Sequence, residues 1–187
     1  MECVLHIKNM VCDRCVMVVR ALLVQLGMKP LAVGLGTVRL AEEPDELKMR
    51  RLEEELGALG FGLIADPRTR IVEGMKTEIV RLVHRSDDPL RVNLSDHLAG
   101  LFHHEYGYLS RLFSEATGTT VEKYFIAQKT ERVKELLAYG ELSLAQIADR
   151  LGYSSSAHLS AQFKSVTGMT PGQFRRNAAS RTPLDKV

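Results

Sequence analysis

The feature that most constrains this chain is a repeat in its second half. Residues 108–120, YLSRLFSEATGTT, align with residues 158–170, HLSAQFKSVTGMT, at an offset of 50 positions. The identical pairs are Leu109/Leu159, Ser110/Ser160, Phe113/Phe163, Thr117/Thr167, Gly118/Gly168 and Thr120/Thr170. Agreement at one fixed offset indicates two copies of a single supersecondary unit.

A short amphipathic segment precedes each copy of the repeat. These segments are LSDHLAGLF at 94–102 and LSLAQIADRL at 142–151. Gly152 follows the second segment, and Ser154 or Ser155 is then the expected helix N-cap. A helix, a tight turn, a second helix and a Thr-Gly stop are typical of a helix-turn-helix unit.

Helical periodicity predicts two further helices in this half of the chain. The segment 121–138, between the two copies, offers Phe125, Val133, Leu136 and Leu137 for packing. The segment 70–85, before the first copy, places Ile71, Met75, Ile79, Leu82 and Val83 on one stripe. The second half is therefore expected to be all-helical.

Residues 70–176 resemble an AraC/XylS-family DNA-binding domain, and the most diagnostic stretch is IADRLGYSSSAHLSAQFKSVTGMTPGQFR. The resemblance implies two helix-turn-helix units joined by a linker helix, with double-stranded DNA as the partner. By position it implies that the residues facing bases are Tyr106, Gly107, Ser110, Arg111, Ser156, Ala157, His158 and Ala161.

Three positions depart from that family pattern. His103 replaces the usual turn glycine of the first unit, and Glu105 stands where a capping serine is common. Ala161 occupies a position that often carries a long polar side chain. Arg111 is then the strongest candidate for recognition of a guanine.

The first 66 residues alternate strand and helix signals. The expected order is a strand in CVLHIKN (3–9), a helix over 13–26, a hairpin over 31–40 that turns at Gly36-Thr37, a helix over 45–59, and a short strand in GFGLIAD (60–66). This βαββαβ order predicts a ferredoxin-like fold with both helices on one face of a four-stranded sheet. The fold class is thus α+β, followed by the all-α domain.

Cys12 and Cys15 form a CxxC pair in the loop that enters the first predicted helix. The helix dipole there favours thiolate over thiol, which suits both metal ligation and nucleophilic chemistry. Structural zinc, redox and metal-carrier sites all share this spacing. A closed zinc site needs two more Cys or His ligands, and none lies at ligand spacing. Two thiolates alone suit a soft monovalent ion such as Cu(I).

Residues 2–65 resemble a heavy-metal-associated domain, the fold of copper chaperones and of the metal-binding modules of transport ATPases. The motif NMVCDRC, the helix after it, the hairpin and the closing GALGFGLIAD carry the resemblance. It implies that Cys12 and Cys15 are the metal ligands, that Met10 is a buried support of the loop, and that Phe61 shields the thiolates. Cu(I) is the expected ion, and Zn(II) and Hg(II) stay open.

Composition and charge add weaker constraints. Residues 1–66 carry 8 Lys and Arg against 10 Asp and Glu, while the remaining residues carry 17 against 13, so the second half suits a polyanionic partner better. Three cysteines are too few for a disulfide framework. With no secretory signal or spanning segment, we expect a soluble cytoplasmic protein without membrane contact. No phosphate-binding loop or nucleophile motif suggests an enzyme.

The sequence therefore predicts a heavy-metal-associated-like domain over 1–66, an AraC-type DNA-binding domain over 67–177 and a disordered tail over 178–187. The expected function is a transcriptional regulator that responds to a soft metal ion. The alternatives are a thiol-redox-responsive regulator, an N-terminal domain that only dimerises or contacts a partner, and a metal-carrying module for which DNA binding is incidental. The operator, the sign of regulation and a homodimer stay open.

Overall fold

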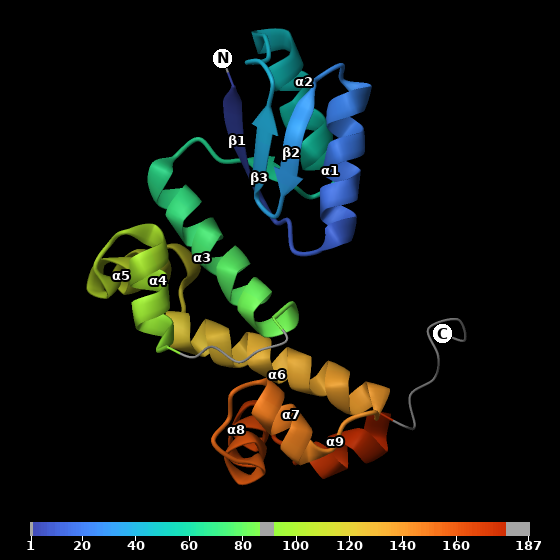
Figure 1. The fold of residues 1–187 in the computed structure, drawn as a ribbon, viewed down its shortest axis with the longest axis vertical. Coiled ribbons are helices and arrows are strands. Elements are labelled where there is room, and N and C mark those ends of the chain that lie inside the picture. The colour runs from blue at the N-terminus through green and yellow to red at the C-terminus, as the bar shows by residue number, and fades with distance from the viewer. Residues whose placement is uncertain (1, 87–91, 179–187) are drawn as a thin grey trace. The chain divides into compact units, whose positions relative to one another are not determined.

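The computed structural model describes residues 2–86 and 92–178 (Figure 1). The chain divides into two compact units, and the division falls inside a helix, between Glu78 and Ile79. Gly107–Leu112 are grouped with the first unit. The domain boundary predicted between residues 66 and 67 lies at the start of that helix and not at this division. The boundary stays a prediction.

The first compact unit contains a four-stranded antiparallel sheet and two complete helices, besides parts of two later helices. The sheet and the complete helices are β1 (Cys3–Lys8), α1 (Asp13–Gln25), β2 (Pro30–Gly34), β3 (Thr37–Leu40), α2 (Glu46–Ala58) and β4 (Gly62–Leu63). The strand order is β2-β3-β1-β4. The predicted order of strands and helices is confirmed, although β4 pairs over two residues only, opposite Ile7 and Lys8.

One hydrophobic cluster holds the helices against the sheet. Val19, Leu22 and Leu23 of α1 join Leu52 and Leu56 of α2. The sheet and the loops contribute Ile7, Met10, Met28, Val38 and Leu40. Since α1 and α2 also contact each other, both helices cover the same face of the sheet (Figure 1). Full burial of each large side chain contributes about 1.5–3 kcal/mol.

Local chemistry sets the bounds of α2 and of the hairpin. The Asp45 carboxylate accepts a hydrogen bond from the backbone N–H of Lys48 at 2.8 Å, so Asp45 is the N-cap and not the first helical residue. Leu59 is the C-cap, so the predicted helix was one residue too long at each end. Gly36 has a φ of +75° in the turn between β2 and β3, a conformation that favours glycine.

The rest of the described chain is helical. Its elements are α3 (Pro67–His84), α4 (Leu94–Phe102), α5 (Tyr106–Thr117), α6 (Val121–Tyr139), α7 (Leu144–Arg150), α8 (Ser156–Thr167) and α9 (Pro171–Ala178). The prediction of two short-helix–turn–helix units with a helix between them is confirmed. The predicted tail 178–187 lies outside the described residues, except for Ala178, which ends α9.

The start of α3 differs from the prediction of 70–85, because residues 67–69 also belong to the helix. The Asp66 carboxylate accepts hydrogen bonds from the backbone N–H and the hydroxyl of Thr69, at 2.8 and 2.7 Å, and these bonds lower the pKa of Asp66. Pro67 occupies the first helical position, where its missing N–H costs nothing. The polar junction is therefore mostly the capped first turn of α3.

The buried stripe of α3 also differs from the prediction. The buried residues are Val72, Met75, Ile79 and Val83, whereas Ile71 and Leu82 are partly exposed.

A second cluster, formed by α6, α7, α8 and the turn before α8, holds the other compact unit together. It contains Val133, Leu136, Leu137, Ile147, Ala148, Leu151, Tyr153, Leu159 and Phe163.

A paired substitution on α2 tests the core of the first unit. Leu52 is fully buried, whereas Leu47 is 62% exposed on the same helix. Leu52→Ala should lower the free energy of unfolding by about 2–5 kcal/mol, because it removes transfer energy and leaves a cavity. Leu47→Ala should change it by no more than about 0.5 kcal/mol. Urea unfolding followed by circular dichroism measures both, and equal losses would contradict the assigned core.

Candidate nucleic-acid interface and thiol site

The two repeated units match at the level of single hydrogen bonds. In each unit a threonine hydroxyl, Thr117 or Thr167, donates to the carbonyl of the preceding phenylalanine at 2.7 Å. The next residue is a glycine in the left-handed conformation, Gly118 or Gly168, and it ends the helix. The Thr-Gly stop that the sequence predicted is thus confirmed in both copies.

An aromatic pair also recurs in both units. The rings of Phe113 and Tyr124 meet edge to face with centroids 5.5 Å apart. At the same offset, Phe163 and Phe174 meet in the same way at 5.6 Å. Phe113 and Phe163 are buried. Each pair fastens the second helix of a unit, α5 or α8, to the helix that follows it.

The turns of the two units are built differently. His103 ends α4 with a φ of +55°, so it takes the left-handed place that a glycine usually fills, as predicted. Gly152, at φ +65°, has this conformation in the second turn. A left-handed conformation costs a non-glycine residue about 1–2 kcal/mol, so the first turn is strained.

The N-caps differ as well. Ser155 is the N-cap of α8, because its hydroxyl accepts a hydrogen bond from the backbone N–H of His158 at 3.1 Å. Glu105 is the N-cap residue of α5 and makes no side-chain capping hydrogen bond. Its negative charge still lies at the positive end of the helix dipole, which is favourable.

On α5, the predicted base-facing residues have different surroundings. Gly107 and Arg111 are exposed, whereas Tyr106 and Ser110 are partly buried. The Tyr106 hydroxyl donates a hydrogen bond to the Glu122 carboxylate at the start of α6. This bond lowers the pKa of Glu122. Tyr106 therefore already has a partner within the protein.

On α8, Ala157, His158 and Ala161 are exposed and Ser156 is partly buried. Residues 157, 158 and 161 share one helical face, because neighbours three and four positions apart lie on the same side. The His158 ring is oriented from within the domain. Its Nδ1 lies 3.1 Å from the Ser154 hydroxyl, and its edge meets the Tyr153 ring at 5.4 Å between centroids.

Sequence reasoning missed the support beneath α8. The Tyr153 hydroxyl donates to the Gln162 side-chain oxygen at 2.8 Å, and the Lys129 ammonium lies 4.0 Å from the centre of the Tyr153 ring. Burial lowers the pKa of Lys129 to about 8 and raises that of Tyr153 to about 12. Lys129 lies four residues from both Phe125 and Val133 on the apolar stripe of α6, a signal that could have revealed it.

The two predicted thiol ligands lie together at the start of α1. Cys12 is the N-cap residue and Cys15 is in the first helical turn, with their sulfur atoms 3.5 Å apart. Both side chains are partly exposed. Hydrogen bonds from the Cys15 backbone N–H and thiol, followed by the backbone and charge of Arg14, lower the pKa of Cys12.

The loop before the cysteines is anchored by a buried side chain, Met10, and by a hydrogen bond from Asn9. Met10 is 2% exposed and belongs to the same cluster as the core of the sheet. Asn9 has a φ of +70°, and its side-chain amide donates to the Gly60 carbonyl at 2.8 Å. Phe61 follows Gly60 and packs on the cluster that contains Met10 and contacts Cys15. Met10 and Phe61 thus both contact the core of the sheet, while the shielding of the thiols by Phe61 stays a prediction.

The thiol pair does not belong to a larger cluster of ligand-type side chains in the described residues. Within 2–86 and 92–178, no group of three or more Cys, His, Asp or Glu side chains is placed to hold a metal ion. In the same part of the chain, no helix is both long and apolar enough to cross a membrane.

Comparison with known proteins identifies the helical part of the chain. The family model described as a helix-turn-helix domain matches residues 98–177. The transcriptional regulator GlxA of Rhizobium meliloti is 34% identical over 120 residues, which cover 64% of this chain and 34% of that protein. A putative AraC-like transcription regulator of Streptomyces lividans is 35% identical over 69 residues, or 37% of this chain and 23% of the relative. Residues 98–177 thus form a helix-turn-helix domain that is similar to domains of AraC-like transcription regulators.

A solved structure supports the same assignment. The C-terminal domain of AraT, a response regulator from Geobacillus stearothermophilus, superposes with a TM-score of 0.53 at 25% identity. The match covers 65% of this chain and 94% of that domain. The chain spans about a third or less of the length of the two curated relatives. The similarity is therefore confined to part of the length of these relatives.

The pH dependence of alkylation tests the lowered pKa of Cys12. Iodoacetamide reacts with thiolate, so Cys12 should reach half of its maximal rate at a lower pH than in the free peptide NMVCDRC. Mass spectrometry after timed labelling measures the rate at each pH. Cys15→Ala should raise the midpoint only in part, because the backbone N–H at position 15 remains. Cys3→Ser is the control and should change nothing, and a midpoint equal to that of the peptide would contradict the geometry.

Proposed function

We propose that this protein is a transcriptional regulator that binds double-stranded DNA through its AraC-family domain. The observation that carries the proposal is the pair of matching units, in which α5 and α8 each bury one side and expose the other. Such second helices enter the DNA major groove with their N-terminal residues toward the bases. The cytoplasm is the expected place of action.

The exposed residues define what each helix would read. Arg111 would donate two hydrogen bonds to O6 and N7 of a guanine. On α8, Ala157 and Ala161 would offer only methyl groups, which suit the methyl of thymine. His158 is the polar residue of that face. The first helix-turn-helix unit would therefore supply the strongest hydrogen-bonded contact. The second helix-turn-helix unit would discriminate between DNA sequences mainly by shape and apolar contact.

We further propose that the first compact unit, which holds the sheet with α1 and α2, is a ferredoxin-like, heavy-metal-associated-type domain. Its thiols would respond to a soft metal ion. Cys12 and Cys15 would hold the ion, and a set of two thiol donors fits Cu(I) better than ions that need four ligands. The distance of 3.5 Å between the sulfur atoms supports this proposal. An ion shared with a second chain would produce a homodimer.

Two other functions use the same thiols or the same domain. A disulfide between Cys12 and Cys15 would make the protein a redox-responsive regulator. A unit that only contacts a partner or a second copy would need neither thiol. These alternatives differ in the reagent that changes DNA binding, so one set of titrations separates them.

Arg111→Ala tests the proposed base contact. The variant should lose about 1–3 kcal/mol of specific binding and accept more bases at one position of the site. The measurement is selection from a randomised duplex library, followed by anisotropy titration at fixed salt. Arg51→Ala is the matched control, since it removes one exposed guanidinium from α2. An unchanged base preference in Arg111→Ala would exclude Arg111 from readout.

A double substitution tests the thiol site. Reduced protein should bind about one Cu(I) per chain, whereas Cys12→Ser/Cys15→Ser should fold and bind none, because it lacks both soft donors. Cu(I) should change the affinity of the wild-type protein for the selected DNA by about 5- to 150-fold, and DNA should change Cu(I) affinity by the same factor. Cys3→Ser should behave as wild type.

Each alternative predicts a different outcome of these titrations. Superimposed curves with and without Cu(I) would exclude the sensor, whatever the affinity for DNA. A separation that occurs only after oxidation would establish the redox alternative. Tight Cu(I) binding by the double variant would place the metal elsewhere.

A further inference from the structure

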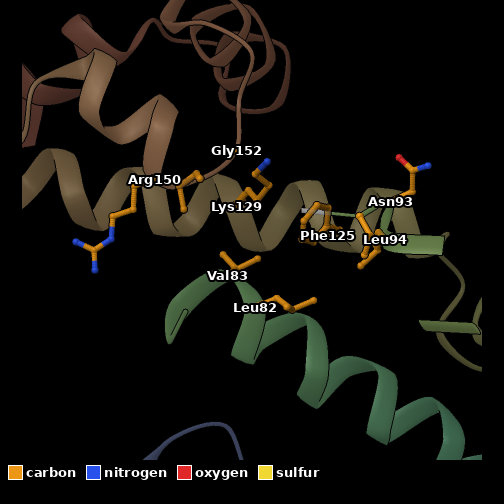
Figure 2. Close-up of a pocket in the computed structure, with 10 residues that line it drawn as sticks. Leu82, Val83, Asn93, Leu94, Phe125, Lys129, Arg150 and Gly152 are labelled. Carbon is orange, nitrogen blue, oxygen red and sulfur yellow. The ribbon is translucent and has the colours of Figure 1, made fainter. Parts of the chain in front are cut away.

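A pocket of about 210 Å³ opens on the second compact unit (Figure 2). Its walls come from the end of α3, the start of α4, the middle of α6 and the turn after α7. The side chains that matter for its chemistry are Val83, Leu94, Phe125, Leu151 and Lys129. Four of these five side chains are apolar, so the pocket combines hydrophobic walls with one ammonium group.

The Lys129 ammonium has no carboxylate partner among the described residues. It lies over two aromatic rings, 4.0 Å from the centre of Tyr153 and 5.2 Å from that of Phe125. Burial lowers the pKa of Lys129 to about 8, and no carboxylate of the described residues offsets this loss of hydration. Tyr153, whose pKa is about 12, stays a neutral phenol and cannot be the counter-ion.

Arg150 also lines the pocket, but its orientation differs. Figure 2 shows its guanidinium directed away from Lys129 and from the apolar side chains. Lys129 is thus the cation that a molecule seated on these walls would meet. A partly buried cation that has no carboxylate partner among the described residues, next to an apolar surface, is complementary to an anion that carries an apolar body.

We propose that this pocket binds a small organic carboxylate. Its carboxylate would pair with the Lys129 ammonium, and its hydrocarbon body would contact Val83, Leu94, Phe125 and Leu151. The pocket is smaller than the roughly 300–1,000 Å³ of pockets that hold drug-sized ligands, so it suits a short aliphatic or single-ring acid. The site is separate from the thiols and does not require that α8 contact DNA.

Occupancy of the site would be sensed by α8. Tyr153 joins Lys129 to that helix, through its hydrogen bond to Gln162 and its ring contact with His158. A carboxylate that draws the ammonium away from the Tyr153 ring changes the surroundings of this tyrosine. The amide signals of Tyr153 and Gln162 should therefore respond together with those of the pocket walls.

The test uses the reduced full-length chain labelled with ¹⁵N and titrated with hexanoate at pH 7. Saturable shifts are expected at the amides of Leu94, Phe125 and Tyr153, with a Kd of about 1 mM or below. Hexanamide, which has the same body without the charge, should bind at least about tenfold more weakly. Affinity for hexanoate should fall as the pH rises through about 8, where free Lys129 loses its proton.

Substitutions identify the cation. Lys129→Gln should weaken hexanoate binding by about tenfold or more, whereas Lys129→Arg, which keeps the charge, should retain it. Lys123→Gln, at an exposed position on the same helix, is the matched control and should bind as wild type. The proposal is overturned if no saturable shifts occur, if the amide binds as well as the acid, or if Lys129→Gln binds unchanged.

Discussion

Two aromatic pairs, each with one buried phenylalanine, determine which sides of α5 and α8 face the solvent. Phe113 against Tyr124 and Phe163 against Phe174 fix the rotation of α5 and α8 about their axes. An edge-to-face pair contributes about 0.5–1.5 kcal/mol beyond the area that it buries. Because each phenylalanine selects the buried side of its helix, it also selects the exposed side, which carries Arg111 on α5 and Ala161 on α8.

The sequence predicted the elements whose signals are local. Thr-Gly after each second helix, the hairpin turn at Gly36 and the apolar periodicity of α6 all act within a few residues, so they could be recognised from the sequence. The predicted bounds were wrong where a side chain caps a helix end, or where pairing with another strand sets the length of a strand. Asp66 extends α3 by capping it, and pairing with only two residues of β1 limits β4.

The two candidate sites were predictable to different degrees. Cys12 and Cys15 are close in sequence, so their proximity follows from the first helical turn alone. By contrast, the place of Lys129 beneath α8 depends on a ring that arrives from a turn 24 positions later in the chain. A charged residue on an apolar stripe signals such a contact, but only the folded domain shows that its partner is Tyr153.

The two repeated units are alike in their buried side chains and unlike on their surfaces. Tyr106, the first residue of α5, donates a hydrogen bond to Glu122, whereas Ser156 is the residue at the matching position of α8. Arg111 likewise has Ala161 as its counterpart. A protein that reads DNA with two different helices favours a target without internal symmetry. One chain bound to such a target would have a polarity, with one end facing upstream and the other downstream.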